Sequence, residues 1–162
     1  MPELIEQIKD ISGEEVYQFV CFKMGSEEYA LDITDVQEVI RYKQITPVPQ
    51  MPDFTLGVVN IRGSVIPVFD IRKKFCLPEK PVDSFSRIVV VRVNDVNISF
   101  IVEEMLDNIK FRKSQIDPVP PVKMAIDKSC IKGIGEFTDR MVIILDLKNI
   151  HIEIKKSIFE MN

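Results

Sequence analysis

The stretch GVVNIRGSVIPVFDI, residues 57–71, decides how this chain folds. β-Branched residues dominate on both sides of Ile61-Arg62-Gly63, which indicates two strands joined by a tight turn. Gly63 suits a left-handed turn position because it has no Cβ. We therefore predict a hairpin formed by residues 56–60 and 65–71.

The segments before and after this hairpin add a second hairpin and two short helices. Residues 17–24 and 29–33 flank a Gly25-Ser26 turn and predict a hairpin of the same kind. Thr34-Asp35-Val36-Gln37 fits a capping box, and the apolar spacing after it predicts a short helix over residues 35–41. A second short helix is predicted over residues 70–77, before Pro78.

The chain contains a weak internal repeat, with an offset of roughly 70 residues. Residues 19–33 resemble residues 88–102, and residues 57–71 resemble residues 133–147. Each half is therefore expected to form a small all-β lobe. A closed barrel protects the strand edges that a small open sheet would expose, so we expect two equivalent barrels. Residues 80–86 would link them.

The ends of the chain are less regular than its middle. Leu4, Ile5, Ile8 and Ile11 lie at helical spacing, which fits either a docked N-terminal helix or a frayed tail. The last dozen residues could form a closing strand or a short helix, and no long terminal helix is expected.

Composition limits the classes of function. The chain has 162 residues, of which 46% are hydrophobic and 28% charged, as in soluble globular proteins. Its net charge of −4 supplies no positive field for phosphate backbones. Trp is absent and Tyr occurs only 3 times, which argues against an oligonucleotide-binding barrel that stacks bases. Nucleic acid is not expected as a partner.

Cysteine usage and hydropathy indicate the compartment. Cys21, Cys76 and Cys130 lie far apart, which argues against a disulfide framework and against a zinc site. No apolar run approaches the length that crosses a bilayer, and the acidic N-terminus does not resemble a secretory signal. We expect a cytoplasmic protein that does not insert into the membrane.

The inventory of catalytic groups is poor. The only histidine, His151, has no motif around it and is expected at the surface or an edge, while Cys21 and Cys130 fit core packing. Asp32, Asp35 and Glu38 could include an acid–base pair, but a capped, solvated helix face is the favoured reading.

The glycines of the second half do not supply catalytic machinery either. Gly133 and Gly135 lack the third glycine of a phosphate loop and fit a bulge or close strand packing. We predict no enzyme activity, no cofactor and no metal. Binding through apolar grooves and strand edges is the remaining class.

The assembled motifs resemble the CheW family of bacterial chemotaxis coupling proteins. The resemblance runs from about Tyr17 to about Ile150 and is most specific over residues 57–71, where a Gly-Val pair, Asn-Ile-Arg-Gly and an apolar strand with Pro and Asp follow one another. Residues 28–40, Gly133-Ile134-Gly135 and Asp139-Arg140-Met141 match further parts of the family pattern.

The resemblance implies a mainly β fold of two intertwined, SH3-like, five-stranded β-barrel lobes packed together, with a few short helices. The expected lobes are residues 17–80 and 86–150 of a single CheW-like domain at residues 1–162, with terminal segments available to pack across them. The implied protein is an adaptor that joins methyl-accepting chemoreceptors to the regulatory domain of the histidine kinase CheA, at receptor arrays on the inner face of the membrane. A related coupling protein of a non-chemotaxis receptor–kinase circuit is the alternative.

The same resemblance suggests which residues contact receptor or kinase. They are Val36, Glu38, Val39, Ile40, Asn60, Arg62, Gly63, Arg87 and Asn108. Glu38 and Arg62 could instead pair with each other and brace the chain rather than touch a partner. We expect the kinase at the strand edges of the first lobe and the receptor at the groove wall nearest Val36 and Ile40. Arg87 and Asn108 stand where relatives often carry apolar groove residues, so receptor preference is expected to differ.

Overall fold

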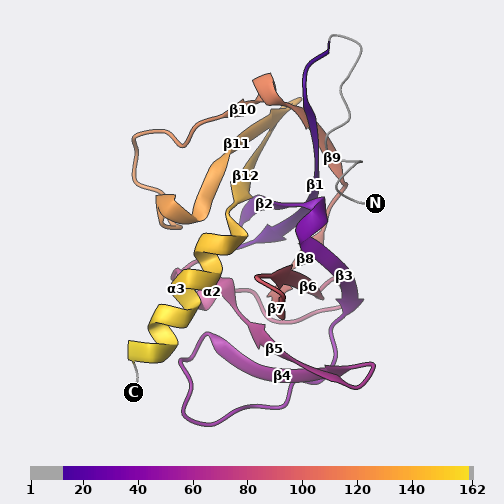
Figure 1. Ribbon diagram of the computed structural model, residues 1–162, viewed down its shortest axis with the longest axis vertical. Helices are drawn as coiled ribbons and strands as arrows, with labels where there is room; N and C mark the ends of the chain where they lie inside the picture. The colour runs from indigo at the N-terminus through magenta and orange to yellow at the C-terminus, as the bar shows by residue number, and fades with distance from the viewer. Residues whose placement is uncertain (1–12, 161–162) are drawn as a thin grey trace.

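The computed structural model describes residues 13–160, and strands make up most of their regular structure (Figure 1). The strands are β1 (Val16–Met24), β2 (Glu27–Asp32), β3 (Val36–Arg41), β4 (Thr55–Ile61), β5 (Ser64–Phe69), β6 (Arg87–Val93), β7 (Val96–Val102), β8 (Glu104–Met105), β9 (Ile109–Arg112), β10 (Ile116–Asp117), β11 (Ile131–Phe137) and β12 (Arg140–Leu145). The helices are η1 (Ile33–Asp35), α2 (Ile71–Lys74), η2 (Lys113–Gln115), η3 (Lys128–Cys130) and α3 (Leu147–Glu160).

The first sheet has 5 strands in the order β3-β6-β7-β5-β4. The segment after β3 returns to β4, where the amide and carbonyl groups of Thr46 and Val58 exchange two hydrogen bonds of 2.9 Å. This exchange closes the sheet into a barrel. The neighbouring Gly57 permits it, because a Cβ at Gly57 would lie 2.0 Å from the Thr46 carbonyl oxygen.

The second sheet has 7 strands, in the order β10-β11-β12-β2-β1-β8, with β9 also paired to β1. β8 and β9 both pair with β1 at one side of the sheet, and β10 is the edge strand at the other side. Only η2 separates β9 from β10 along the chain. The sheet is therefore brought round on itself as well. Gly135 lets it curve tightly, because a Cβ there would lie 2.7 Å from the Phe111 ring.

The two sheets share one plan, as the internal repeat predicts. In the first sheet the β6–β7 hairpin meets β5 in parallel, and in the second the β1–β2 hairpin meets β12 in parallel. The predicted lobe boundaries are nevertheless wrong. Residues 36–102 supply the whole first sheet, whereas residues 16–32 join strands from residues 104–145. The first hairpin of each half thus completes the sheet of the other half, because its parallel partner strand lies there.

Apolar packing forms three clusters that follow this topology. One lies within the first sheet and includes Val59, Ile66 and Ile88, and another lies within the second and includes Phe19 and Ile144. The third cluster takes residues from both sheets and from α3. Successive residues of one strand point to opposite faces, so single strands such as β6 contribute to two clusters.

A buried ion triad lies where the chain passes from the first sheet to the second. Arg72 of α2 donates to Asp70 and to Glu103, each at 3.0 Å, and Glu103 also accepts from the Gly25 amide in the β1–β2 turn. Burial acts to lower the pKa of Arg72, but its bonds to the two carboxylates outweigh burial and raise it. The triad thus ties α2, the β7–β8 junction and the β1–β2 turn together.

The prediction of a helix over residues 35–41 is wrong. Residues 36–41 form β3, whose side chains alternate between half-buried and exposed and which pairs antiparallel with β6. The capping signal belongs to η1, where the Asp32 carboxylate accepts from the Thr34 amide. The helix predicted over residues 70–77 is confirmed in a shorter form as α2, with Asp70 as its N-cap.

The C-terminal expectation is corrected in two respects. α3 has 14 residues, longer than the short element expected, and packs Leu147, Ile150 and Ile154 onto the shared cluster. His151 lies on the same buried side and is 6% exposed, so it is not a surface residue. The N-terminal helix or tail lies outside the described residues. Among the helices of residues 13–160, none is long and apolar enough to span a membrane.

Candidate partner-binding surface

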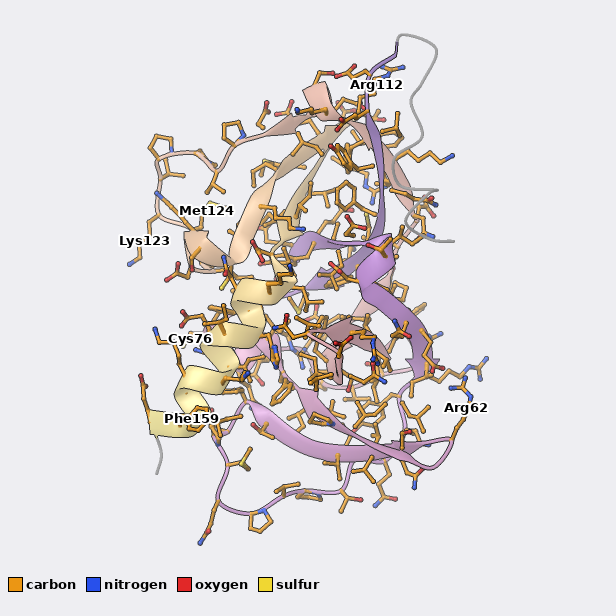
Figure 2. The ribbon with its side chains drawn as sticks, viewed as in Figure 1. Arg62, Cys76, Arg112, Lys123, Met124 and Phe159 are labelled. Atoms are coloured by element: carbon orange, nitrogen blue, oxygen red, sulfur yellow. The ribbon has the colours of Figure 1, made fainter. Side chains whose placement is uncertain are left out.

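The β4–β5 turn holds Arg62 away from the body of the first sheet. Ile61 and Ser64 pair across a two-residue loop in which Arg62 has φ +50° and Gly63 has φ +85°. Two successive positive φ values are typical of the turn that best matches strand twist in hairpins. Figure 2 shows the Arg62 side chain at the outer end of this hairpin. We call residues 60–65 the hairpin tip.

Arg62 and Glu38 form a bidentate ion pair across the surface. The two guanidinium nitrogens lie 2.6 and 2.9 Å from the two carboxylate oxygens of Glu38 on β3. The hydrogen bonds lower the pKa of Glu38 and raise that of Arg62, so both groups stay charged at neutral pH. The Arg62 side chain keeps 74% of its surface exposed, which leaves much of it accessible to a partner.

Polar contacts hold the remainder of the hairpin tip. The Asn60 side-chain oxygen accepts from the Gly63 amide at 2.9 Å, and the Lys43 ammonium donates to the Asn60 carbonyl at 2.7 Å. The first contact holds the turn within the hairpin, and the second ties it to the segment that follows β3. The tip therefore presents Arg62 in a defined position.

The other predicted contact residues divide between the two sheets. Val39 is 37% exposed on β3, whereas Val36 and Ile40 pack partly against the apolar clusters. Arg87 begins β6 opposite Arg41 and donates to the carbonyls of Ser84 and Ser86. Asn108 is exposed between β8 and β9, in the second sheet. The structure therefore brings together Glu38, Asn60, Arg62 and Gly63, but places Asn108 apart from them.

Sequence reasoning missed one exposed apolar residue at the tip. Val65 follows the turn, lies opposite Asn60 on β4 and is 66% exposed. The alternation of β5, in which Ile66 and Val68 are buried, is a signal that could have identified Val65 as outward-facing. Arg62 and Val65 give the tip both a cation and an apolar contact.

The candidate catalytic groups do not assemble into a reactive site. Asp32 caps η1, and burial together with Asp32 raises the pKa of Asp35. Burial raises the pKa of the Cys21 thiol to about 11, which keeps it protonated at neutral pH. Burial also raises the pKa of Cys130, so both thiols are core groups. In the described part of the chain, no three His, Cys, Asp or Glu side chains are grouped to hold a metal ion.

Gly133 and Gly135 serve close packing, as predicted. A Cβ at Gly133 would lie 2.8 Å from the Asp117 carbonyl oxygen, and the pairing of β11 with β12 shifts register between Ile131 and Gly133. Both predicted reasons for these glycines, a bulge and close approach of strands, are therefore confirmed.

Two closed, interlocked sheets with an exposed Arg62–Glu38 pair at the surface define a double β-barrel protein. Comparison with known proteins agrees with this class. Residues 18–153 match the model of the CheW-like domain, and the chain belongs to the CheW family.

Individual relatives support the assignment along most of the chain. It is 35% identical to the chemotaxis protein CheW of Helicobacter pylori, over 93% of this chain and 94% of that protein. It is 31% identical to the chemotaxis protein CheW of Klebsiella aerogenes, over 88% and 87% of the two chains. Among solved structures, the scaffolding protein TtCheW from Thermoanaerobacter tengcongensis superposes with a TM-score of 0.78 at 33% identity, covering 87% of this chain and 91% of that one.

Proposed function

We propose that this protein is a chemotaxis adaptor that couples methyl-accepting chemoreceptors to the histidine kinase CheA and lets receptor signals control autophosphorylation. The observation that carries the proposal is the CheW-like match over residues 18–153. The proposed adaptor has no catalytic activity, needs no cofactor, and works in the cytoplasm at receptor arrays beneath the membrane.

The proposed contact surface centres on the hairpin tip and β3. An exposed ion pair contributes little to the stability of a fold, so bracing alone gives Arg62 little energetic importance. An Arg that becomes buried in an interface can supply a large share of the binding energy. Because Arg62 is mostly exposed and held in a defined position, we propose that it contacts a partner directly. Val36, Val39, Ile40, Arg87 and Asn108 complete the proposed contact set.

Calorimetric titration with the regulatory domain of the CheA encoded in the same genome tests this proposal. We expect saturable binding at micromolar affinity or tighter, weakened at least tenfold in Arg62→Glu. Arg92→Glu is the matched control, because Arg92 is exposed on the same sheet and makes only surface contacts, 3.4 Å to Asn97 and 3.7 Å to Asp95. Absence of binding to every CheA of that genome would contradict the chemotaxis assignment.

A charge swap separates contact from bracing. Glu38→Arg combined with Arg62→Glu restores an ion pair across the same two strands. If Arg62 contacts the kinase, the double variant binds as weakly as Arg62→Glu alone. Recovery of binding in the double variant would instead give the pair a bracing role and remove Arg62 from the contact set.

A further inference from the structure

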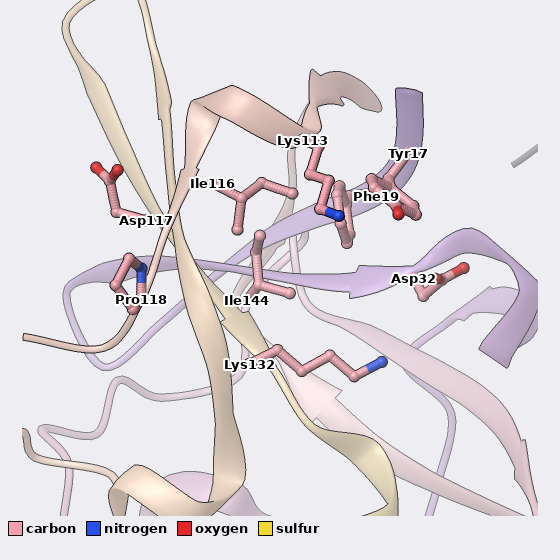
Figure 3. Close-up of a pocket in the computed structure, with 9 residues that line it drawn as sticks. All are labelled: Tyr17, Phe19, Asp32, Lys113, Ile116, Asp117, Pro118, Lys132 and Ile144. Carbon is pink, nitrogen blue, oxygen red and sulfur yellow. The ribbon is translucent and has the colours of Figure 1, made fainter. Parts of the chain in front are cut away.

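A cavity of about 460 Å³ opens into the second sheet, away from the residues proposed for partner contact (Figure 3). None of those contact residues lines it. Its lining comes from β1, β2, β10, β11 and β12 together with η2, which connects β9 to β10. The cavity is thus the mouth of the second barrel, a place where small-molecule sites occur in β-barrel proteins.

The interior of this barrel mouth is apolar. Phe19 and Ile144 are 4% and 2% exposed and belong to the second sheet's own cluster, so they form a closed floor. Tyr17 and Ile116 are half-buried and pack against that cluster from the sides. A volume of this size is within the range that encloses an organic molecule, and this lining favours a flat apolar body.

Two lysines stand at the opening. In Figure 3 the Lys113 side chain extends toward Phe19, and the Lys132 side chain runs beneath Ile144. Both residues are exposed, and neither ammonium group forms an ion pair with a residue of the described chain. Both cations are therefore available to a ligand that enters the mouth.

Carboxylates nearby are engaged or directed elsewhere. Asp32 Oδ1 accepts from the Thr34 amide at 3.0 Å and from the Thr34 hydroxyl at 2.9 Å. Asp117 points away from the other lining side chains in Figure 3. Asp35 lies close enough for Lys132 to oppose the rise that burial causes in its pKa. Beside Lys113, the Glu14 carboxylate accepts from the Ser114 amide at 2.7 Å, and the Glu15 carboxylate accepts from the Tyr17 hydroxyl.

We propose that the barrel mouth binds a small amphipathic carboxylate, with its apolar body against Phe19, Ile116 and Ile144 and its anionic group at Lys113 and Lys132. The apolar walls set the shape of the ligand body, and the lysines set its charge. A charge-assisted hydrogen bond to Lys113 at the edge of an apolar cavity discriminates an acid from a neutral molecule of the same shape.

Titration of the ¹⁵N-labelled protein with 1-naphthoate, followed by amide chemical shifts, tests the proposal. We expect saturable shifts concentrated at Tyr17, Phe19, Ile116, Lys132 and Ile144. For a ligand of this size, the expected dissociation constant is on the order of 1 mM or below. 1-Naphthalenemethanol, which has the same rings and no charge, should bind about tenfold more weakly.

Two lysine variants locate the anion. Lys113→Gln combined with Lys132→Gln should weaken naphthoate binding about tenfold, whereas Lys128→Gln, at an exposed lysine outside the cavity, should leave it unchanged. Unaltered amide shifts elsewhere in each variant verify the fold. Shifts centred on another surface, no saturation at about 10 mM, or equal binding of the alcohol and the acid would each overturn the proposal. Because the measurement is direct binding, its result is independent of kinase or receptor coupling.

Discussion

Two glycines of the β4–β5 hairpin separate the cost of backbone strain at positive φ from the cost of a steric clash with a neighbouring strand. Gly63→Ala adds a Cβ that meets nothing within 4 Å, so only its φ of +85° opposes the change. We expect a loss of about 1 kcal/mol in the free energy of unfolding. Gly57→Ala also faces a positive φ, and its Cβ would lie 2.0 Å from the Thr46 oxygen. We expect a loss of about 3 kcal/mol or more.

Urea denaturation of the two glycine variants measures this difference. Gly57→Ala should displace only the Thr46 segment that closes the barrel against Val58. The largest changes in amide chemical shift are therefore expected at Thr46 and Val58. Equal losses in Gly57→Ala and Gly63→Ala would contradict the explanation that Gly57 is required for the approach of a second strand.

His151 should make stability depend on pH. Burial lowers its pKa and Lys155 lowers it further. Its Nδ1 atom is buried and has no hydrogen-bond partner among residues 13–160. The folded state therefore favours neutral imidazole, and the unfolded chain binds more protons once the pH falls below about 6.5. Stability is highest above that value and decreases as the pH falls toward the depressed folded pKa.

Urea unfolding between pH 7.5 and pH 5, compared with His151→Gln, checks the histidine effect. The wild-type protein should lose more stability over this range than the variant, because Gln does not titrate. Parallel pH profiles would exclude a contribution from His151. A profile in which the wild type gains stability on acidification would reverse the assigned direction of its pKa shift.

The conformation or burial of a single residue could be predicted only where it depends on neighbours in the sequence. Gly63 and Arg62 were predicted within a tight turn because the turn pattern is contained in a few neighbouring residues. The burial of His151 depends instead on packing of α3 against strands from both sheets, which no pattern around His151 contains. The Arg62–Glu38 pair was foreseen as one alternative, and β-pairing brings its partners together across 24 positions.

At the scale of elements, the triad of Asp70, Arg72 and Glu103 should be the most sensitive polar contact. Arg72→Met leaves two carboxylates with exposed fractions of 2% and 12% without their cation. Breaking a buried pair in this way typically costs about 3 to 5 kcal/mol. Lys73→Met on the same helix removes only a half-exposed pair with Glu79, and should lower the free energy of unfolding far less.

Thermal and urea unfolding of these two variants distinguishes a buried connection from a surface pair. Arg72→Met should also shift amide signals in the β1–β2 turn, because Glu103 holds the Gly25 amide there. Similar unfolding midpoints for Arg72→Met and Lys73→Met would show that the triad does not connect the elements as described.

Helices and strands were predictable from sequence where the spacing of apolar residues fitted only one type of secondary structure. The strands around Gly63 and the cap of α2 follow from local patterns. β3 was misassigned because Val36, Val39 and Ile40 fit helical spacing, while its strand conformation is set by pairing with β6, roughly 50 residues away along the chain. α3 was underestimated because its exposed side carries Ile152 and Phe159, which blur the amphipathic pattern.

At the scale of the whole molecule, cutting the chain after residue 83 should leave two fragments that do not fold alone. Residues 1–83 hold β1 and β2 of one sheet and β3, β4 and β5 of the other. Residues 84–162 hold the complementary strands, so each fragment contains two incomplete barrels. Mixing equimolar fragments should restore the dispersed amide spectrum of the intact protein.

Circular dichroism and amide spectra of each fragment alone, of the mixture and of the intact chain provide this comparison. A well-dispersed spectrum from either fragment alone would contradict the exchange of hairpins between halves. The repeat made the existence of two similar barrels predictable. The exchange itself was not, because similar hairpins satisfy either arrangement, and it is the pairing of β7 with β5, β6 with β3, β2 with β12 and β1 with β9 that distinguishes them.

The exchange of hairpins has a mechanical consequence. The backbone passes between the barrels through η1 and through Glu103, and the shared apolar cluster fills the space between the sheets. Rotation of one barrel against the other would have to break the Glu103 contacts and expose that cluster. A force on the hairpin tip should therefore turn both barrels together as one rigid body. Two proteins bound to different barrels would then keep a fixed angle to each other.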